Sequence, residues 1–210
     1  MKLAIFGGTG QTGRCLLEQA PARGHAAVVL ARNAARLAPP PRGVTVLEGQ
    51  VGDAAAVART VAGADAVISV LGPVRGQAPY AVSQGMDKIM AAMRDHGVQR
   101  LIVTAGAGVR DPLDKPSGGH AVFGLLVKVL ARPVYEDMAR MVETVRASDR
   151  AWTVVRVPRL VDGPATGRLT VGYVNSALGT SLTRAELAAF VLGQLTDETW
   201  LRKAPAVSNA

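Results

Sequence analysis

The sequence predicts an α/β fold, a doubly wound parallel sheet with helices on both faces. Two observations support this class. Short apolar runs alternate with helical patterns over the first three quarters of the chain, and a glycine-rich turn joins the first run to the first helical pattern. Strands that alternate with helices imply right-handed crossovers and therefore a parallel sheet. Ligands bind such sheets beyond the carboxyl ends of the strands, so we expect one crevice lined by the loops after residues 6, 31, 49, 71, 105 and 157.

The individual elements follow in chain order. Aliphatic runs predict strands at residues 3–6, 26–31, 44–49, 66–71, 100–105 and 152–157. Apolar residues at helical spacing predict a first helix through residues 15–20 and further helices at 54–61, 82–96 and 134–148. Consecutive prolines exclude regular structure just before the third strand.

The last fifty residues are less regular. They contain a loop rich in glycine and proline, a short strand at 169–171 and a helix from Thr183. Thr183 and Glu186 match a capping box, in which each side chain bonds the backbone N–H of the other residue. We expect this small carboxyl-terminal segment to cover the substrate side of the crevice.

Composition sets the class of protein. With 210 residues, 49% of them hydrophobic and 19% charged, the chain is expected to form a single domain over residues 1–210. Its most apolar later window, residues 121–131, is too short to span a membrane. Because the first strand begins at once, we expect no signal peptide. The single cysteine, Cys15, forms no internal disulfide, so we expect a cytoplasmic protein with no membrane association.

The net charge of +8 raises the question of nucleic-acid binding. The basic residues are spread along the chain, and only 4% of the residues are aromatic and able to stack on bases. We therefore expect no nucleic-acid partner. His25, His96 and His120 are far apart and lack the spacing of metal ligands, so no metal site is expected.

Three glycines, Gly7, Gly10 and Gly13, lie between the first strand and the first helix. Unpaired N–H groups and the helix dipole at such a turn favour a bound phosphate. The pattern, in this local context, predicts dinucleotide binding. The alternative is a tight turn that packs the helix closely on the strand.

Two arginines after the second strand favour NADP(H) over NAD(H). Proteins that bind NAD commonly place an acidic side chain there to hold the ribose 2′-hydroxyl. Here Arg32 follows the strand, Arg36 comes one helical turn later, and no carboxylate occurs between residues 26 and 42. A guanidinium group binds a 2′-phosphate through two N–H groups, whereas an acid would repel it. The alternative is that both arginines are solvated surface residues.

The loops after the third and fourth strands offer further cofactor contacts. Gln50 and the backbone of Val51 are placed to bond an adenine ring, whereas Asp53 is expected to cap the next helix. Gly72 would let the backbone approach the cofactor. Arg75 either reaches a phosphate or faces solvent.

With these motifs the chain resembles the NAD(P)H-binding (NmrA-like) family of atypical short-chain dehydrogenases/reductases, and within it flavin reductase/biliverdin-IXβ reductase. The resemblance is carried by IFGGTGQTG (5–13), VLARNAARL (29–37) and TRAELAAFVLGQL (183–195), and it extends over nearly the whole chain. It implies a Rossmann fold and a nicotinamide cofactor.

The resemblance also implies which residues bind the cofactor. Its matches are Gly7, Thr9, Gly10, Gln11, Thr12 and Gly13 at the pyrophosphate, Arg32 and Arg36 at the 2′-phosphate, Gln50 and Val51 at the adenine, Leu71, Gly72 and Thr104 after later strands, and Met138, Arg159 and Leu160 on the nicotinamide side. Relatives usually carry Asp at position 50. The flavin reductase carries His at position 159, so chemistry inferred from that imidazole does not transfer.

A dedicated proton donor is missing from the sequence. Ordinary members of the larger superfamily use Tyr-x-x-x-Lys to exchange a proton with the substrate. Tyr135 is followed four residues later by Ala139, and Tyr80 and Tyr173 also lack the lysine. Thr104 is only a weak candidate for a catalytic hydroxyl. A flavin or quinone accepts hydride into a conjugated ring and takes its proton from solvent, so it suits this site better than a ketone does.

We therefore predict an NADPH-dependent reductase of a flavin such as FMN, a quinone or a related conjugated ring compound. Two alternatives stay open: an NADP-sensing regulatory protein without turnover, and a tailoring reductase or isomerase of an aromatic natural product. Residues 111–132 are expected to form a substrate-side flap or a dimer surface, with core packing as the alternative. The partner is expected to be a small-molecule substrate, and the chain a monomer or homodimer.

Overall fold

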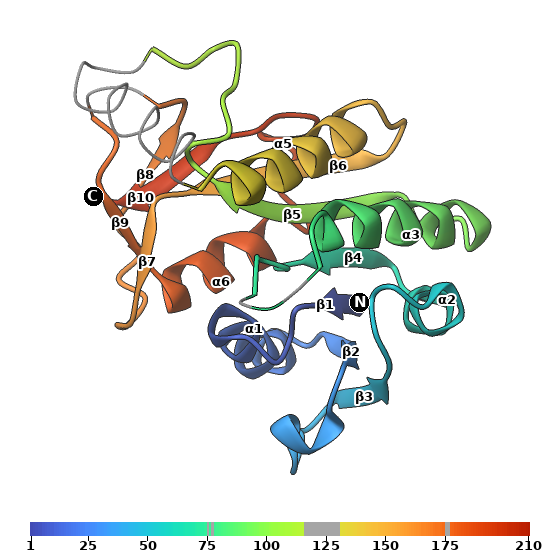
Figure 1. Ribbon diagram of the computed structural model, residues 1–210. Helices are drawn as coiled ribbons and strands as arrows, with labels where there is room; N and C mark the ends of the chain where they lie inside the picture. The colour runs from blue at the N-terminus through green and yellow to red at the C-terminus, as the bar shows by residue number, and fades with distance from the viewer. Residues whose placement is uncertain (75, 77, 116–130, 175–176) are drawn as a thin grey trace.

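The computed structural model describes residues 1–74, 76, 78–115, 131–174 and 177–210. Its main sheet has eight strands in the order β3-β2-β1-β4-β5-β6-β10-β8, and a second, two-stranded sheet pairs β7 with β9 (Figure 1). The strands are β1 (Lys2–Phe6), β2 (Ala26–Ala31), β3 (Val44–Glu48), β4 (Ala66–Ser69), β5 (Arg100–Gly106), β6 (Ala151–Val157), β7 (Arg159–Val161), β8 (Leu169–Gly172), β9 (Ser181–Thr183) and β10 (Ala206–Asn209).

The first six strands of the chain all pair in parallel. β10 continues the sheet parallel to β6, whereas β8 pairs antiparallel to β10 at the edge. The prediction of a doubly wound parallel sheet is confirmed. Because β1 lies between β2 and β4, the strand order reverses there, and the carboxyl ends of the parallel strands meet at one edge of the sheet.

Helices cover both faces of the sheet. They are α1 (Gln11–Ala22), η1 (Ala34–Leu37, a 3₁₀ helix), α2 (Ala54–Val61), α3 (Ala81–Asp95), α5 (Arg132–Arg146) and α6 (Arg184–Gly193). In Figure 1, α1 and α6 lie on one face, and α2, α3 and α5 lie on the other. Each face has its own hydrophobic cluster, called here the α1/α6 cluster and the α2/α3/α5 cluster after the helices that contribute to it.

The central strands are apolar on both sides because both faces of the sheet are covered. In β1, Leu3 and Ile5 belong to the α1/α6 cluster, whereas Ala4 and Phe6 belong to the α2/α3/α5 cluster. All four are at most 1% exposed. This burial explains why the strand is an unbroken aliphatic run in the sequence.

The capping box predicted for α6 is only half correct. The Thr183 hydroxyl accepts a hydrogen bond from the Glu186 N–H (3.3 Å). The Glu186 carboxylate, 2% exposed, does not return the bond but accepts from the backbone N–H groups of Thr166 and Gly167. The Thr183 N–H donates instead to Asn209 Oδ1 (2.8 Å). A buried carboxylate is better satisfied by two N–H groups than by one, and Glu186 therefore fastens the loop before β8.

Two further expectations concern the predicted flap and a membrane span. Of the predicted flap at 111–132, residues 116–130 lie outside them. Within the described part of the chain, no helix has both the length and the hydropathy that a bilayer span requires.

Candidate functional site

The glycine-rich turn after β1 is built from close backbone contacts. Gly7 has a φ of +88°, and a Cβ there would lie 2.8 Å from the carbonyl carbon of Val70, just beyond β4. A Cβ on Gly13 would lie 2.2 Å from the carbonyl oxygen of Gly7. That oxygen also accepts a hydrogen bond from the Gly10 N–H (3.0 Å). Glycine is required at both ends of the turn because no side chain fits.

The turn presents its middle residues to solvent. Gly10 and Gln11 are exposed and Thr9 is half-buried, whereas Thr12 and Gly13 are buried at the start of α1. All six residues predicted to surround a pyrophosphate thus lie in one turn and the first turn of its helix, at the carboxyl end of β1.

The first turn of α1 has no side-chain cap. Its N-cap residue is Gly10, and it carries no acidic residue. Three other helices differ: the Asp53 carboxylate caps α2, the Thr183 hydroxyl caps α6, and the Asp137 carboxylate caps α3 from a neighbouring helix. Like α1, α5 has no side-chain cap. No carboxylate of the described residues bonds the first N–H groups of α1, and the helix dipole there favours an anion.

The two arginines predicted to bind a 2′-phosphate lie at the same edge of the sheet. Arg32 directly follows β2 and Arg36 lies in η1, and both are exposed. Phe6 of β1 is in register with Leu30 of β2, so the loops that follow these strands are neighbours. Within the described residues, neither guanidinium group has a carboxylate within 4 Å.

The loop after β3 contacts α3. Gln50 is exposed and Val51 is half-buried. A Cβ on Gly85 of α3 would lie 2.7 Å from a methyl group of Val51, so this glycine makes room for the valine. Asp53 accepts hydrogen bonds from two N–H groups of α2 (2.9 and 3.2 Å), which confirms it as the helix cap.

The residues after β4 and on β5 lie at the same edge. Leu71 packs against the α2/α3/α5 cluster and Gly72 is exposed, whereas Arg75 lies outside the described residues. Thr104, half-buried on β5, follows Val103 of the α2/α3/α5 cluster, so strand alternation places it on the α1/α6 side.

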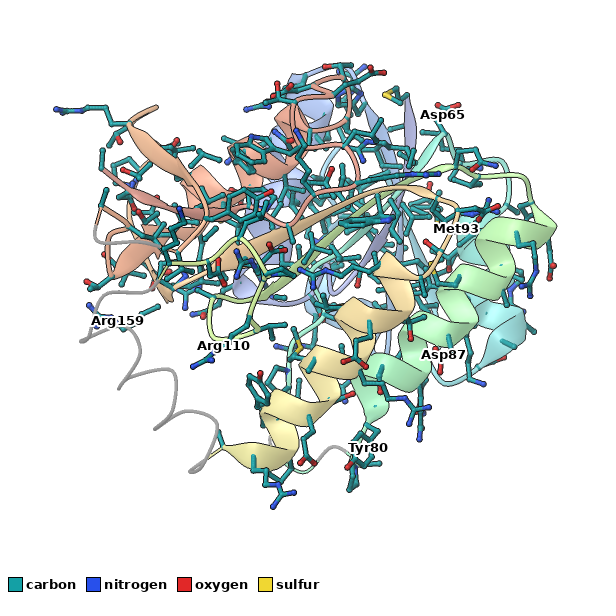
Figure 2. All side chains as sticks on the ribbon, turned by 90° about the horizontal axis from the view of Figure 1, so that it is seen from above. Asp65, Tyr80, Asp87, Met93, Arg110 and Arg159 are labelled. Atoms are coloured by element: carbon teal, nitrogen blue, oxygen red, sulfur yellow. The ribbon has the colours of Figure 1, made fainter. Side chains whose placement is uncertain are left out.

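The three residues predicted for the nicotinamide side are not brought into one cluster. Met138 is 8% exposed and belongs to the α2/α3/α5 cluster. Leu160 packs against the α1/α6 cluster on the opposite face of the sheet. Arg159 is exposed on β7 (Figure 2).

Asp137 is a residue of this region that the sequence analysis missed. Its carboxylate is 7% exposed and accepts hydrogen bonds from the N–H groups of Val82 (3.1 Å) and Ser83 (2.8 Å), so it caps α3 from α5. Next to it, at the start of α3, lies Tyr80 (Figure 2). Its hydroxyl donates a hydrogen bond to the carboxylate of Glu136 in α5 (3.3 Å). Because more than fifty residues separate Asp137 from the helix it caps, no local pattern predicts this contact.

A buried ion pair between Arg156 and Asp114 was also missed. Arg156 lies on β6 and is 0% exposed, and its guanidinium group also donates to the carbonyl oxygens of Ala204 (2.8 Å) and Val109 (3.0 Å). Burial alone would raise the pKa of Asp114. The hydrogen bonds from Arg156 and from two backbone N–H groups outweigh this effect, so the pKa of Asp114 lies below its usual range. The pair joins the loop after β5 to the carboxyl-terminal end of β6.

Two other findings concern metal binding and the single cysteine. No group of three or more potential metal ligands occurs within the described residues. Cys15 packs against the α1/α6 cluster, and burial raises the pKa of its thiol above the ordinary value. A raised pKa keeps the thiol protonated and unreactive at neutral pH.

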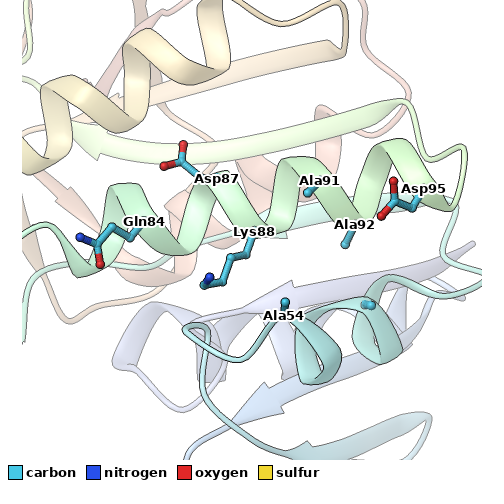
Figure 3. Close-up of a pocket in the computed structure, with 8 residues that line it drawn as sticks. Ala54, Gln84, Asp87, Lys88, Ala91, Ala92 and Asp95 are labelled. Carbon is cyan, nitrogen blue, oxygen red and sulfur yellow. The ribbon is translucent and has the colours of Figure 1, made fainter.

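A hollow on the described residues lies away from the glycine turn. It has a volume of about 470 Å³ and runs between α2 and α3, lined by Ala54, Ala58, Gln84, Asp87, Lys88, Ala91, Ala92 and Asp95 (Figure 3). It follows the outer sides of two helices rather than the ends of the strands. In a doubly wound sheet, ligands bind at the strand ends, so the glycine turn is the better candidate site.

Comparison with known proteins agrees with this geometry. Residues 7–198 match the model of a family described as NAD(P)H-binding. The uncharacterized protein YwnB of Bacillus subtilis is 32% identical over 108 residues, which are 51% of this chain. The match spans 48% of YwnB, so it covers about half the length of that relative.

Solved structures share the fold over the whole chain. The oxidoreductase YlbE of Lactococcus lactis aligns with a TM-score of 0.82 and 21% identity, covering 100% of this chain and 91% of that one. A short-chain dehydrogenase/reductase of Veillonella parvula, in complex with NADP, gives 0.81 and 18%, covering 99% and 94%. ChuY, an anaerobillin reductase of Escherichia coli O157:H7, gives 0.78 and 20%, covering 100% and 97%. The chain therefore belongs to the NAD(P)H-binding family and has the Rossmann fold of these structures.

Proposed function

We propose that this protein is an NADPH-dependent reductase of a flavin, a quinone or a related conjugated ring compound. The observation that carries the choice of cofactor is the pair of exposed guanidinium groups on Arg32 and Arg36. They lie at the edge of the sheet where the uncapped first turn of α1 also lies. No carboxylate occurs between residues 26 and 42 to hold a free ribose 2′-hydroxyl.

The residues present fit a nicotinamide dinucleotide phosphate. Glycine at positions 7 and 13 lets the turn close tightly against Val70 and against its own backbone, which leaves the first N–H groups of α1 facing outward from the strand end. The N–H groups of α1 would hold the pyrophosphate, and Arg32 and Arg36 would hold the 2′-phosphate. When bound, NADPH supplies a hydride to an acceptor placed over the same edge.

The acceptor is inferred from the lack of a proton donor. Tyr135 is followed by Ala139 rather than lysine four residues on. Asp137 is buried and committed to the N–H groups of α3. A flavin or quinone spreads the negative charge over its ring and is protonated by solvent afterwards, whereas the alkoxide from a simple ketone needs an acid as it forms. A structural relative that is named as a reductase, ChuY, supports the same reaction class.

Steady-state oxidation of NADPH tests this proposal directly. The purified protein would be assayed with FMN, with short-chain quinones and with a simple ketone as the negative comparison. We expect turnover with at least one conjugated acceptor, little with the ketone, and lower efficiency with NADH than with NADPH. Turnover of the ketone alone, or equal efficiency with NADH and NADPH, would contradict the proposal.

A second candidate is a regulatory protein that binds NADP(H) without turnover. Its supporting observation is that Asp137, the buried carboxylate at this end of α5, serves a helix cap and is not available as an acid or base. Calorimetry with NADPH and NADP⁺ separates the two candidates. Tight binding combined with inertness toward every acceptor in the assay would favour the sensor. For either candidate we propose a cytoplasmic location, which the single thiol at Cys15 supports.

A further inference from the structure

We propose that Arg14 is a positioning residue for recognition of the 2′-phosphate, because it holds the turn that carries Arg36. The proposal rests on the proposed NADP(H) specificity and adds a residue to it. Arg14 follows Gly13 in the first turn of α1. Its Nη2 atom donates a hydrogen bond to the backbone carbonyl oxygen of Arg36 (2.9 Å), which joins the pyrophosphate turn to the 3₁₀ helix η1.

Among the described residues, this hydrogen bond joins the polar backbone of η1 to another element. The other hydrogen bonds of the segment are internal: Asn33 accepts from the Ala35 N–H (2.9 Å) and from the Arg36 N–H (3.3 Å). Leu37 anchors the segment by burying its side chain in the α1/α6 cluster. Among the described residues, only Arg14 holds the polar backbone of η1 from outside. Without this hydrogen bond, the turn that carries the Arg36 guanidinium would be held mainly by the buried side chain of Leu37.

A positive charge at the position of Arg14 is electrostatically unfavourable unless an anion is bound nearby. The positive end of the helix dipole disfavours a cation in the first turn of a helix. Glu18, one turn further along α1, would be the usual partner, yet no ion pair within 4 Å joins the two in the described part of the chain. Arg14, Arg32 and Arg36 thus place three exposed positive charges at one edge of the sheet. A phosphate there would offset their repulsion.

Two nucleotide probes test the proposal without turnover. Adenosine 2′,5′-bisphosphate carries the 2′-phosphate and 5′-AMP lacks it, and their dissociation constants would be measured by calorimetry for the wild type and for Arg14→Gln. We expect Arg14→Gln to weaken the bisphosphate by roughly tenfold and 5′-AMP by less than about twofold. Arg14→Lys, which keeps the charge but not the forked geometry, should recover only part of the loss.

Arg23 supplies the matched control. It follows the last turn of the same helix, is exposed, and also donates to a backbone carbonyl oxygen, that of Ala189 (3.1 Å). Arg23→Gln makes the same change of charge and removes the same kind of hydrogen bond, yet it should leave both probes unchanged. An equal loss in Arg14→Gln and Arg23→Gln would show that net charge alone is responsible and would overturn the proposal.

A double-mutant cycle separates positioning from direct attraction. If Arg14 acts through Arg36, then Arg14→Gln should cost little once Arg36→Gln has already removed the guanidinium group. Additive losses would overturn the positioning role. The wild type distinguishes this failure from failure of the proposed function: a wild-type protein that binds the two probes equally would contradict NADP(H) specificity itself. Discrimination by the wild type that persists in Arg14→Gln would contradict only the role of Arg14.

Discussion

The guanidinium group of Arg156 and the carboxylate of Asp114 form a buried two-point ion pair, with Nη1–Oδ2 and Nη2–Oδ1 both 2.7 Å long. The side chains are 0% and 7% exposed. Asp114 also accepts hydrogen bonds from the backbone N–H groups of Val174 (2.9 Å) and Asp111 (2.8 Å). One carboxylate therefore holds the loop after β5, the segment after β8 and the carboxyl-terminal end of β6 together.

Replacement of Asp114 by Asn should destabilise the protein by about 3–5 kcal/mol, because it leaves the Arg156 charge buried without its counter-ion. Urea unfolding at neutral pH measures the loss. The double variant Asp114→Leu/Arg156→Met should lose less than the single variant, since it buries no unpaired charge. A double variant that is less stable than Asp114→Asn would contradict this account.

The same pair predicts how stability depends on pH. The pKa of Asp114 is lower in the folded protein than in the unfolded chain. Its stabilising contribution is therefore complete above the ordinary carboxyl pKa of about 4 and is lost as the pH falls through the lower folded value. Unfolding free energies measured on both sides of that range should show this loss in the wild type. The loss should be smaller in Asp114→Asn, and an identical pH dependence would argue against the pair.

Replacement of Arg32 by Glu should weaken NADPH on the order of 100-fold while changing NADH little, because it exchanges a charge-assisted hydrogen bond for repulsion of the 2′-phosphate. Calorimetric titration of both cofactors provides the measurement. Arg94→Glu is the control for charge, since Arg94 is exposed in the last turn of α3, away from the carboxyl edge. Equal losses for NADPH and NADH would remove the assignment of Arg32 to the 2′-phosphate.

Replacement of Gly13 by Ala should abolish dinucleotide binding. The added methyl group would lie 2.2 Å from the Gly7 carbonyl oxygen, so the turn has to open. Gly193→Ala is the comparison: that glycine ends α6 and a Cβ there meets nothing within 4 Å. It should be neutral or stabilise by about 0.5 kcal/mol through reduced freedom of the unfolded chain. Titration with NADPH and thermal unfolding check both variants, and normal NADPH binding by Gly13→Ala would be inconsistent with the turn as a phosphate site.

Replacement of Tyr135 by Phe should leave flavin reduction largely intact, since no lysine lies four residues further along α5 to assist proton transfer from its hydroxyl. Steady-state kinetics with NADPH and FMN provides the measurement. A loss of 100-fold, equal to about 2.7 kcal/mol of barrier, would identify Tyr135 as a proton donor.

The elements that the sequence predicted well are those whose own pattern determines them. The strand at Ala26–Ala31 and the helix at Ala54–Val61 match to the residue, because a continuous aliphatic run and an aspartate cap mark them locally. β7, β9 and β10, of three or four residues each, were missed in the less regular last fifty residues of the chain, although β8, equally short, was predicted. Such short strands are defined by their partners, and a partner that lies far away in the chain leaves no periodic signal.

The residues of the candidate site also divide into those that the local sequence predicts and those that it does not. The glycine turn and the arginines after β2 were predictable because they are contiguous in sequence and their chemistry is specific. The hydrogen bond from Arg14 to Arg36 and the cap that Asp137 places on α3 were not predictable, because each depends on how two helices meet. Arg156 was hidden in an otherwise aliphatic strand, WTVVRV, and its partner Asp114 lies in a loop more than forty residues earlier.

β8 has β10 as its only neighbour in the main sheet of the described residues, and β10 in turn joins β6. Breaking the pairing between β6 and β10 would therefore release β8 and β10 from the main sheet together. In native-state hydrogen exchange, the amides of Leu169–Gly172 should share one opening free energy with those of Ala206–Asn209. The two strands of this carboxyl-terminal segment would then behave as one cooperative unit, able to loosen while the glycine turn stays folded.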